Sequence, residues 1–166
     1  MSNIKENYVV SGVEWGSTLY IASFIDWKTT QGVKHGLCAY GYSLYKNQGS
    51  KEKVSIRRDF LFGGEAESPY EAEMKALLEG IVYVSPEERL TIRTIQPSIS
   101  HGINRDLVFW SENNWFTKQG TFVKCRKEWQ ELLQIIQGRK IIAINTQEEE
   151  FTLLQSACRD LLQIYS

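Results

Sequence analysis

The stretch Ser68-Pro69-Tyr70-Glu71-Ala72-Glu73-Met74-Lys75-Ala76-Leu77-Leu78 predicts a helix that carries an acid on its apolar face. Ser68 is suited to cap this helix, Pro69 to occupy its first position, and Glu71 to close a capping box. The apolar residues recur at spacings of three and four and form one stripe. Glu73 falls on that stripe. A carboxylate that faces a core is costly unless it is paired, protonated or bound to a metal. The alternative is an acid at the edge of the stripe whose side chain reaches solvent.

The composition is that of one ordinary globular domain. The chain has 166 residues, of which 42% are hydrophobic and 23% charged, and its formal net charge is −1. These values allow a sizeable core and exclude a general attraction to phosphate backbones, so a nucleic-acid site would have to be a local basic patch. The three cysteines are widely spaced without a CxxC motif, which argues against a disulfide scaffold or a zinc site. Neither a membrane-spanning run nor a signal-peptide core is present, so we expect a soluble, cytoplasmic protein.

Strand and helix patterns follow one another in an order that is typical of an α/β fold. Strands are expected at residues 19–25, 37–45, 54–62, 90–94 and 139–144, and helices at residues 69–83, 97–109, 124–137 and from about 148 onward. Three antiparallel strands followed by strand–helix units predict a mixed five-stranded sheet with helices on both faces. We expect a lead-in over residues 1–18 and a single domain over residues 19–166.

Several motifs in this order resemble the ribonuclease H (type 1) family. The string Tyr70-Glu71-Ala72-Glu73-Met74 resembles the family's Arg-Ala-Glu-Leu stretch, and Glu73 falls at its metal-binding Glu. Gly102-Ile103 matches the Gly-Ile of the following helix, Trp129-Gln130 matches a Leu-Trp-Gln string, and Asp26 falls where an Asp ends the first strand. The resemblance covers about residues 19–164. It implies a ribonuclease H-like α/β fold, whose members cut the RNA strand of an RNA/DNA hybrid with two Mg²⁺ ions.

The catalytic pattern that the resemblance implies is incomplete here. Of its four carboxylates, Asp26 and Glu73 match the first two, whereas Ile95 replaces the third and cannot bind a cation. The fourth depends on the alignment of the last helix. Without a gap, Arg159 takes that position, where it would oppose a metal and could pair with Glu73. One inserted residue would instead bring Asp160 there and complete a reduced Mg²⁺ or Mn²⁺ site.

Other positions of the family pattern also differ in this chain. The loop that carries the family's catalytic histidine reads Gln147-Glu148-Glu149-Glu150, an acidic run typical of a solvated helix start. Neither His35 nor His101 falls where that histidine belongs. A basic and aromatic group remains that could stack on bases and contact phosphates: Trp115, Lys118, Lys124, Arg126 and Lys127. The alternative for this group is an exposed helix start whose tryptophan packs inward.

Two functions follow from these observations. The first, which we favour, is a non-catalytic ribonuclease H-like module that binds nucleic acid, as an RNA/DNA hybrid or a single strand, or binds a protein. The second is an active hybrid ribonuclease whose catalytic residues are Asp26, Glu73 and Asp160 and whose cofactor is Mg²⁺ or Mn²⁺. The number of carboxylates that meet in one cleft separates the two hypotheses. No membrane partner is expected.

Overall fold

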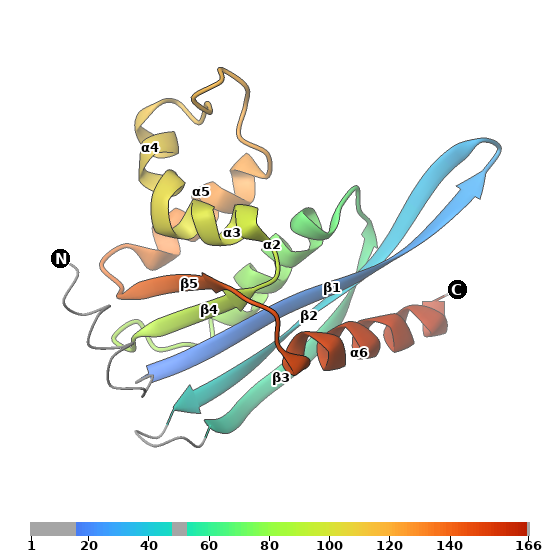
Figure 1. Cartoon of the computed structure of the whole chain (residues 1–166), viewed down its shortest axis with the longest axis horizontal. Helices are drawn as coiled ribbons and strands as arrows, with labels where there is room; N and C mark the ends of the chain where they lie inside the picture. Colours follow the sequence, from blue (N-terminus) through green and yellow to red (C-terminus); the bar gives the residue numbers. More distant parts are fainter. Residues whose placement is uncertain (1–15, 48–52, 166) are drawn as a thin grey trace.

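The computed structural model describes residues 16–47 and 53–165 of the chain. Five strands form one sheet in the order β3-β2-β1-β4-β5. Their bounds are β1 (Gly16–Thr30), β2 (Val33–Asn47), β3 (Lys53–Glu65), β4 (Leu90–Thr94) and β5 (Ile141–Asn145). The β1–β2 and β2–β3 pairs are antiparallel, whereas the β1–β4 and β4–β5 pairs are parallel. The predicted mixed five-stranded sheet is therefore confirmed (Figure 1). The expected lead-in and the turn between β2 and β3 lie largely outside the described residues.

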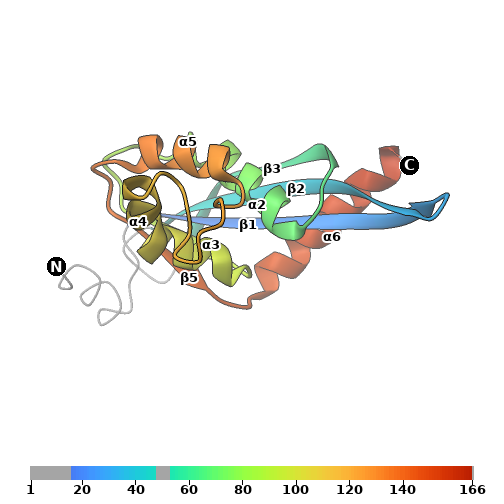
Figure 2. The same cartoon turned by 90° about the horizontal axis from the view of Figure 1, so that it is seen from above.

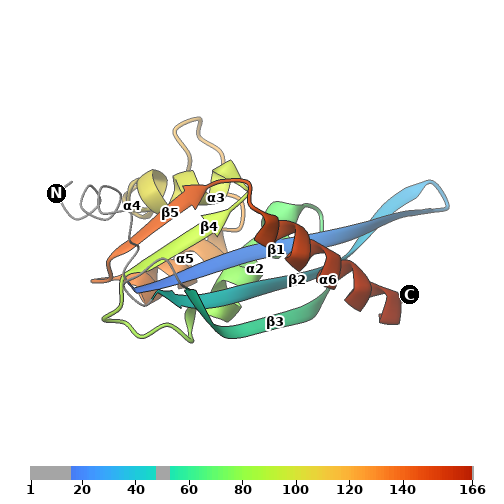
Figure 3. The same cartoon turned by 60° about the horizontal axis from the view of Figure 1, so that its bottom comes forward.

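Helices cover both faces of this sheet. They are α2 (Pro69–Ile81), α3 (Pro97–His101), the π-helical segment η1 (Gly102–Asp106), α4 (Leu107–Glu112), α5 (Arg126–Ile136) and α6 (Glu149–Tyr165). α2 to α5 lie on one face and α6 crosses the other, over β1, β2 and β3 (Figures 2 and 3). The single helix expected at residues 97–109 is instead α3, η1 and α4 in succession. None of the helices in the described ranges is long and apolar enough to cross a membrane.

Alternate residues of β1 belong to different cores. Leu19 and Ile21 pack in the larger core with residues of α2, whereas Tyr20 and Ala22 pack against Phe151 of α6. This is the period of two that a strand imposes on its side chains. The pairing of β1 with β2 continues without a register shift from end to end. Whether a β1 residue has an odd or an even number therefore decides toward which face of the sheet its side chain points.

β1 and β2 extend beyond the strands expected at residues 19–25 and 37–45. Their pairing continues to Thr30 opposite Val33, and the turn residues Gln31 and Gly32 both have positive φ. This end of the hairpin, residues 26–36, projects past the rest of the sheet (Figure 1), and we call it the hairpin arm. The prediction was too short because the apolar run stops at residue 25, whereas cross-strand pairing continues.

Gly63 and Gly64 lie inside β3, although the sequence predicted that they end the strand. Gly64 has a φ of +70°, and the register between β2 and β3 shifts between Cys38 and Ala39, opposite this point. An irregularity of this kind is how a strand accommodates an extra residue without ending. The glycine pair therefore bends β3 without terminating its pairing.

The acidic residues before and within the first turn of α6 hold that helix on the sheet. Glu148 accepts hydrogen bonds from Tyr20 Oη at 2.9 Å and Arg93 Nη1 at 2.7 Å. Glu150 Oε2 accepts three, from Ser43 Oγ at 2.6 Å, Tyr45 Oη at 3.0 Å and Arg58 Nη2 at 3.0 Å. The prediction of a solvated acidic run is therefore wrong for these two glutamates. Only Glu149 between them is exposed.

Replacing Glu150 by alanine is expected to lower the free energy of unfolding by about 1–3 kcal/mol, because the buried Ser43 hydroxyl and the Tyr45 hydroxyl lose their acceptor. Urea unfolding followed by circular dichroism measures the change. Glu149→Ala is the matched control and is expected to stay close to the wild type. Equal effects of the two substitutions would contradict the role assigned to Glu150.

Candidate functional site

Glu73 is fully buried between α2 and the sheet. Its Oε2 accepts a hydrogen bond from Ser23 Oγ of β1 at 2.9 Å and one from Gln96 Nε2 at 3.4 Å. Its Oε1 is also buried and has no hydrogen-bond partner among the described residues. The predicted placement of this acid on the buried stripe of the helix is therefore confirmed. Its two polar neighbours are a hydroxyl and an amide, and neither carries a charge.

Burial raises the pKa of Glu73 to about 8, and the hydrogen bonds from Ser23 and Gln96 oppose this rise only in part. Desolvation disfavours the charged form of an acid, and a hydroxyl and an amide offset it less than a cation would. At neutral pH, Glu73 is therefore mainly a protonated, uncharged carboxylic acid. A divalent cation would have to displace this proton to bind.

Asp26 lies on the other face of β1 from Ser23. The side chains of Ser23 and Ile25 point to the α2 side, and Phe24 packs against α6 residues. By the same alternation, Asp26 points to the α6 side. Its carboxylate is partly exposed and lies 3.7 Å from Lys28 Nζ. The structure therefore does not bring Asp26 to Glu73, and Ser23 is the β1 residue that contacts this acid.

The residue after β4 that faces Glu73 is Gln96. Ile95, which the sequence alignment placed at the third carboxylate position, packs instead with Tyr20 and Phe151 on the α6 side. Gln96 turns to the α2 side, and its backbone N–H donates to Thr94 Oγ1 at 3.0 Å. The residue that faces Glu73 is therefore one position later in the chain than the resemblance implied. Neither residue offers a carboxylate at this position.

Neither Arg159 nor Asp160 reaches Glu73. Both are exposed on α6, where Arg159 Nε lies 3.9 Å from Asp160 and Arg159 Nη2 donates to Ser156 Oγ at 3.2 Å. The inward-facing residue of this turn is Cys158, which is fully buried. Burial, together with the charge of Glu73, raises the pKa of the Cys158 thiol to about 12. Neither of the alternatives for the fourth position holds in the structure.

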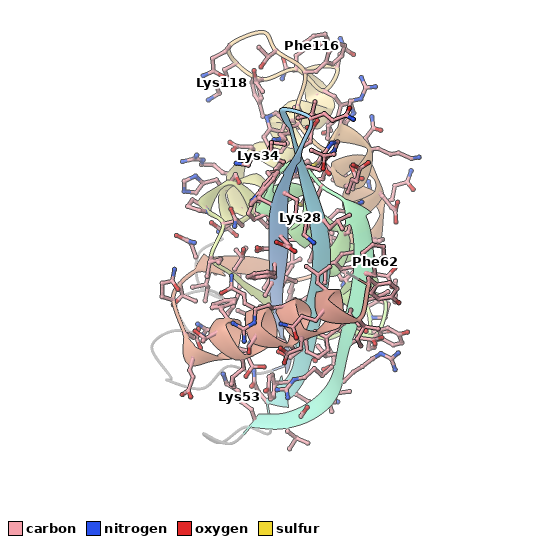
Figure 4. The ribbon with its side chains drawn as sticks, turned by 90° about the vertical axis from the view of Figure 1, so that its right-hand side faces the viewer. Lys28, Lys34, Lys53, Phe62, Phe116 and Lys118 are labelled. Atoms are coloured by element: carbon pink, nitrogen blue, oxygen red, sulfur yellow. The ribbon has the colours of Figure 1, made fainter. Side chains whose placement is uncertain are left out.

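The basic and aromatic group lies on the loop between α4 and α5 and at the start of α5. Lys118, Lys124, Arg126 and Lys127 are all exposed, and Phe116 and Lys118 lie at the outer end of the loop (Figure 4). Phe116 and Phe122 stack with ring centroids 4.4 Å apart, and the Arg126 guanidinium lies 5.0 Å from the Phe122 centroid. Trp115 packs partly against the core, as the inward alternative expected, so Phe122 is the displayed aromatic residue with 62% of its surface exposed.

Two adjoining pockets lie beneath this loop. Their volumes are about 510 and 520 Å³, and they share Asp106, Trp110 and Thr117. Lys118 lines the first pocket and Lys124 the second. Tyr70 at the start of α2 donates to the carbonyl of Lys124 at 3.1 Å and accepts from Trp129 Nε1. These contacts hold the base of the loop against α2 and α5.

Comparison with solved structures identifies the architecture. The foamy viral protease–reverse transcriptase in complex with an RNA/DNA hybrid matches with a TM-score of 0.71 at 14% identity, over 88% of this chain and 20% of that one. The ribonuclease H domain of prototype foamy virus matches with a TM-score of 0.69 at 13% identity, over 90% and 96% of the two chains. The chain has the ribonuclease H fold. It spans a fifth of the length of the protease–reverse transcriptase.

A third match of the same fold is LC9-RNase H1, described as a type 1 RNase H with the type 2 active-site motif. Its TM-score is 0.61 at 14% identity, over 86% of this chain and 72% of that one. No protein-family model and no curated protein sequence matches the chain. The ribonuclease H fold is therefore established by structure, at identities too low to transfer an activity.

The residues around Glu73 do not fit Mg²⁺ or Mn²⁺. These ions take oxygen ligands, with carboxylates supplying the negative charge. Gln96 points its amide nitrogen at Glu73, and the other hydrogen-bond partner of Glu73 is the hydroxyl of Ser23. Within residues 16–47 and 53–165, no group of three or more Asp, Glu, His or Cys side chains is placed to hold a metal ion.

Sequence reasoning missed Ser23 and Gln96, the two residues that donate hydrogen bonds to Glu73. One signal was present for Ser23. It shares the odd numbering of Leu19 and Ile21, the residues of β1 that pack on α2, whereas Asp26 does not. The same signal was present for Gln96, which shares the even numbering of Leu90 and Ile92, the β4 residues of the larger core, whereas Ile95 does not.

Proposed function

We propose that this chain is a non-catalytic ribonuclease H-like protein that binds nucleic acid through the loop of residues 113–125 and the start of α5. The single observation that carries the proposal is the environment of Glu73. This acid is fully buried, has uncharged neighbours and is protonated at neutral pH. Such a group neither holds two divalent cations nor reaches a phosphate.

The loop supports nucleic acid as the ligand class. It combines exposed cations with an exposed aromatic ring above two open pockets, the combination that contacts phosphates and stacks on bases. The net charge of −1 confines such binding to this local patch. Two solved structures of the foamy viral protease–reverse transcriptase, which share this fold, hold an RNA/DNA hybrid and double-stranded DNA, respectively.

The alternative of an active ribonuclease requires Asp26, Glu73 and Asp160 to share one metal site with Mg²⁺ or Mn²⁺. Asp26 is partly exposed beside Lys28, and Asp160 is largely exposed beside Arg159. Glu73, in contrast, is fully buried. Assembling the three would require β1 to turn over or α6 to rotate. We therefore favour the binding function.

Reversing the charge of the loop is expected to weaken nucleic-acid binding roughly tenfold or more, because two phosphate contacts are lost and repulsion is added. The variant is Lys124→Glu with Arg126→Glu, and the ligands are a labelled RNA/DNA hybrid and the two single strands that compose it. Mobility shift at low and moderate salt measures the affinity. The matched control is Lys140→Glu with Arg159→Glu, which makes the same change of net charge at exposed positions outside the loop.

Binding that the loop and control variants weaken equally would contradict the assignment to this loop. A wild-type protein that binds none of the three ligands at low salt would overturn the proposal and point to a protein partner instead.

A further inference from the structure

A pocket of about 370 Å³ lies at the base of the hairpin arm, on a different part of the molecule from the basic loop. Its walls come from the arm, from the end of β3 and from the start of α2. The residues that matter here are Trp27, Lys34 and His35 of the arm and Glu65, Glu67 and Glu71. Neither Glu73 nor the basic loop contributes to this pocket.

Trp27 forms the aromatic wall of the pocket, and β2 is built to hold it there. Trp27 and Gly36 are directly opposite each other in the β1–β2 register. A Cβ on residue 36 would lie 2.8 Å from Trp27 Cζ3 and 2.9 Å from the Ala66 carbonyl, so a side chain at this position would displace the ring. The ring nevertheless keeps 42% of its surface exposed. The indole is therefore packed over Gly36 and still accessible to a ligand.

The ring already accepts a cation from the chain itself. Lys34 Nζ lies 4.6 Å from the Trp27 ring centroid, within the range in which an ammonium is attracted to an aromatic face. Lys34 is exposed at the end of the arm (Figure 4), so it can move away from the ring without disturbing the core. The Lys34 ammonium therefore occupies the place that a cation from another molecule would take.

Three acidic residues line the same pocket as Trp27. Glu65 lies 3.3 Å from His35 Nδ1, whereas Glu67 and Glu71 have neither a hydrogen bond nor an ion pair from their carboxylates to any residue in the described ranges. Three carboxylates against one lysine leave the pocket negative. Negative charge beside an accessible tryptophan face is the combination that binds an ammonium or a guanidinium.

We propose that this pocket binds a lysine or arginine side chain of a partner protein, with Lys34 as an internal competitor for the Trp27 face. The volume is at the small end of ligand sites and suits one long side chain. The apolar stem of a lysine or arginine would lie along the indole while its charge reaches Glu67 and Glu71. Val33, 55% exposed on the same arm, gives the rest of a peptide segment an apolar contact that a free polyamine would not use.

The test follows the indole N–H resonance of Trp27 in the ¹⁵N-labelled full chain, assigned with Trp27→Phe, during titration with a hexalysine peptide. A saturable shift of that resonance is expected. Lys34→Met is expected to tighten binding roughly two- to fivefold relative to Lys28→Met, because only Lys34 competes for the ring. Both substitutions remove one positive charge from the same arm, so Lys28→Met controls for general electrostatics.

Glu67→Gln combined with Glu71→Gln is expected to abolish the shift, whereas Glu79→Gln, exposed on α2 outside the pocket, is expected to preserve it. Three results would overturn the proposal. They are an unmoved Trp27 resonance, equal tightening by Lys34→Met and Lys28→Met, and binding of spermidine at least as tight as that of the peptide, which would assign the pocket to free polyamines.

Discussion

Replacing Glu73 by glutamine is expected to remove a pH dependence of stability that the wild-type chain shows between about pH 4.5 and pH 8. The pKa of Glu73 is raised from its ordinary value to about 8 in the folded state, so the folded chain holds a proton that the unfolded chain releases. The stabilisation that Glu73 contributes is therefore fully present below pH 4.5. As the pH rises, the free energy of unfolding falls by about 1.4 kcal/mol per pH unit at most. Above pH 8 the folded chain releases this proton as well, so Glu73 no longer makes the free energy of unfolding depend on pH.

Glutamine reproduces the shape and the neutral charge of the protonated acid, and its carbonyl can accept from Ser23 and Gln96. The variant is expected to match the wild type near pH 4.5 and to exceed it by several kcal/mol at pH 8. Urea unfolding at a series of pH values measures both. Glu79→Gln, on the exposed side of the same helix, is the control and should keep the wild-type slope. A Glu73→Gln variant with the wild-type slope would mean that Glu73 is charged when folded.

Replacing Trp129 by alanine is expected to lower the free energy of unfolding by about 3–5 kcal/mol, a large share of the total for a domain of this size. Trp129 is fully buried and packs edge-to-face against Trp110 with ring centroids 5.3 Å apart. Its ring also fills the space beside Gly102, where a Cβ would lie 2.3 Å from Trp129 Cη2. The loss combines the removed contacts with the cavity left behind.

The same substitution removes the hydrogen bond from Trp129 Nε1 to Tyr70, which holds the base of the basic loop. Faster amide exchange in residues 113–125 is therefore expected along with the lower stability. Chemical denaturation and hydrogen exchange measure the two effects. Val108→Ala, 60% exposed on α4, should change the stability by less than about 0.5 kcal/mol. A loss below about 1 kcal/mol for Trp129→Ala would contradict the packing described here.

The order of the elements was accessible from the sequence because helices and strands differ in their apolar period. The start of α2 was especially clear, since Ser68 Oγ does accept from the Glu71 N–H at 3.3 Å and Pro69 occupies the first turn. The ends of β1 and β2 were not accessible. Their arm residues are held by pairing between strands, and pairing between backbones leaves no apolar pattern in the sequence.

The candidate site was only partly predictable. Glu73 could be found because an acid breaks the apolar stripe of a helix, whereas Asp26 was chosen for its charge and its position at the expected end of the strand. The rule that decides between Ser23 and Asp26 is the strand period, and it requires knowing which core the odd-numbered residues of β1 enter. The contacts of Glu148 and Glu150 with β1, β2, β3 and β4 join residues distant in the chain, so no local pattern could indicate them.

The central claim is that Glu73 lies in an uncharged, buried site that does not support hydrolysis. Cleavage of a labelled RNA/DNA hybrid tests it most directly, measured in Mg²⁺ and separately in Mn²⁺, with an active ribonuclease H on the same substrate as the positive control. We predict that the wild-type chain and Glu73→Gln leave the hybrid equally intact in both metals. Cleavage by the wild type that disappears in Glu73→Gln would contradict the account and show a working metal site at this acid.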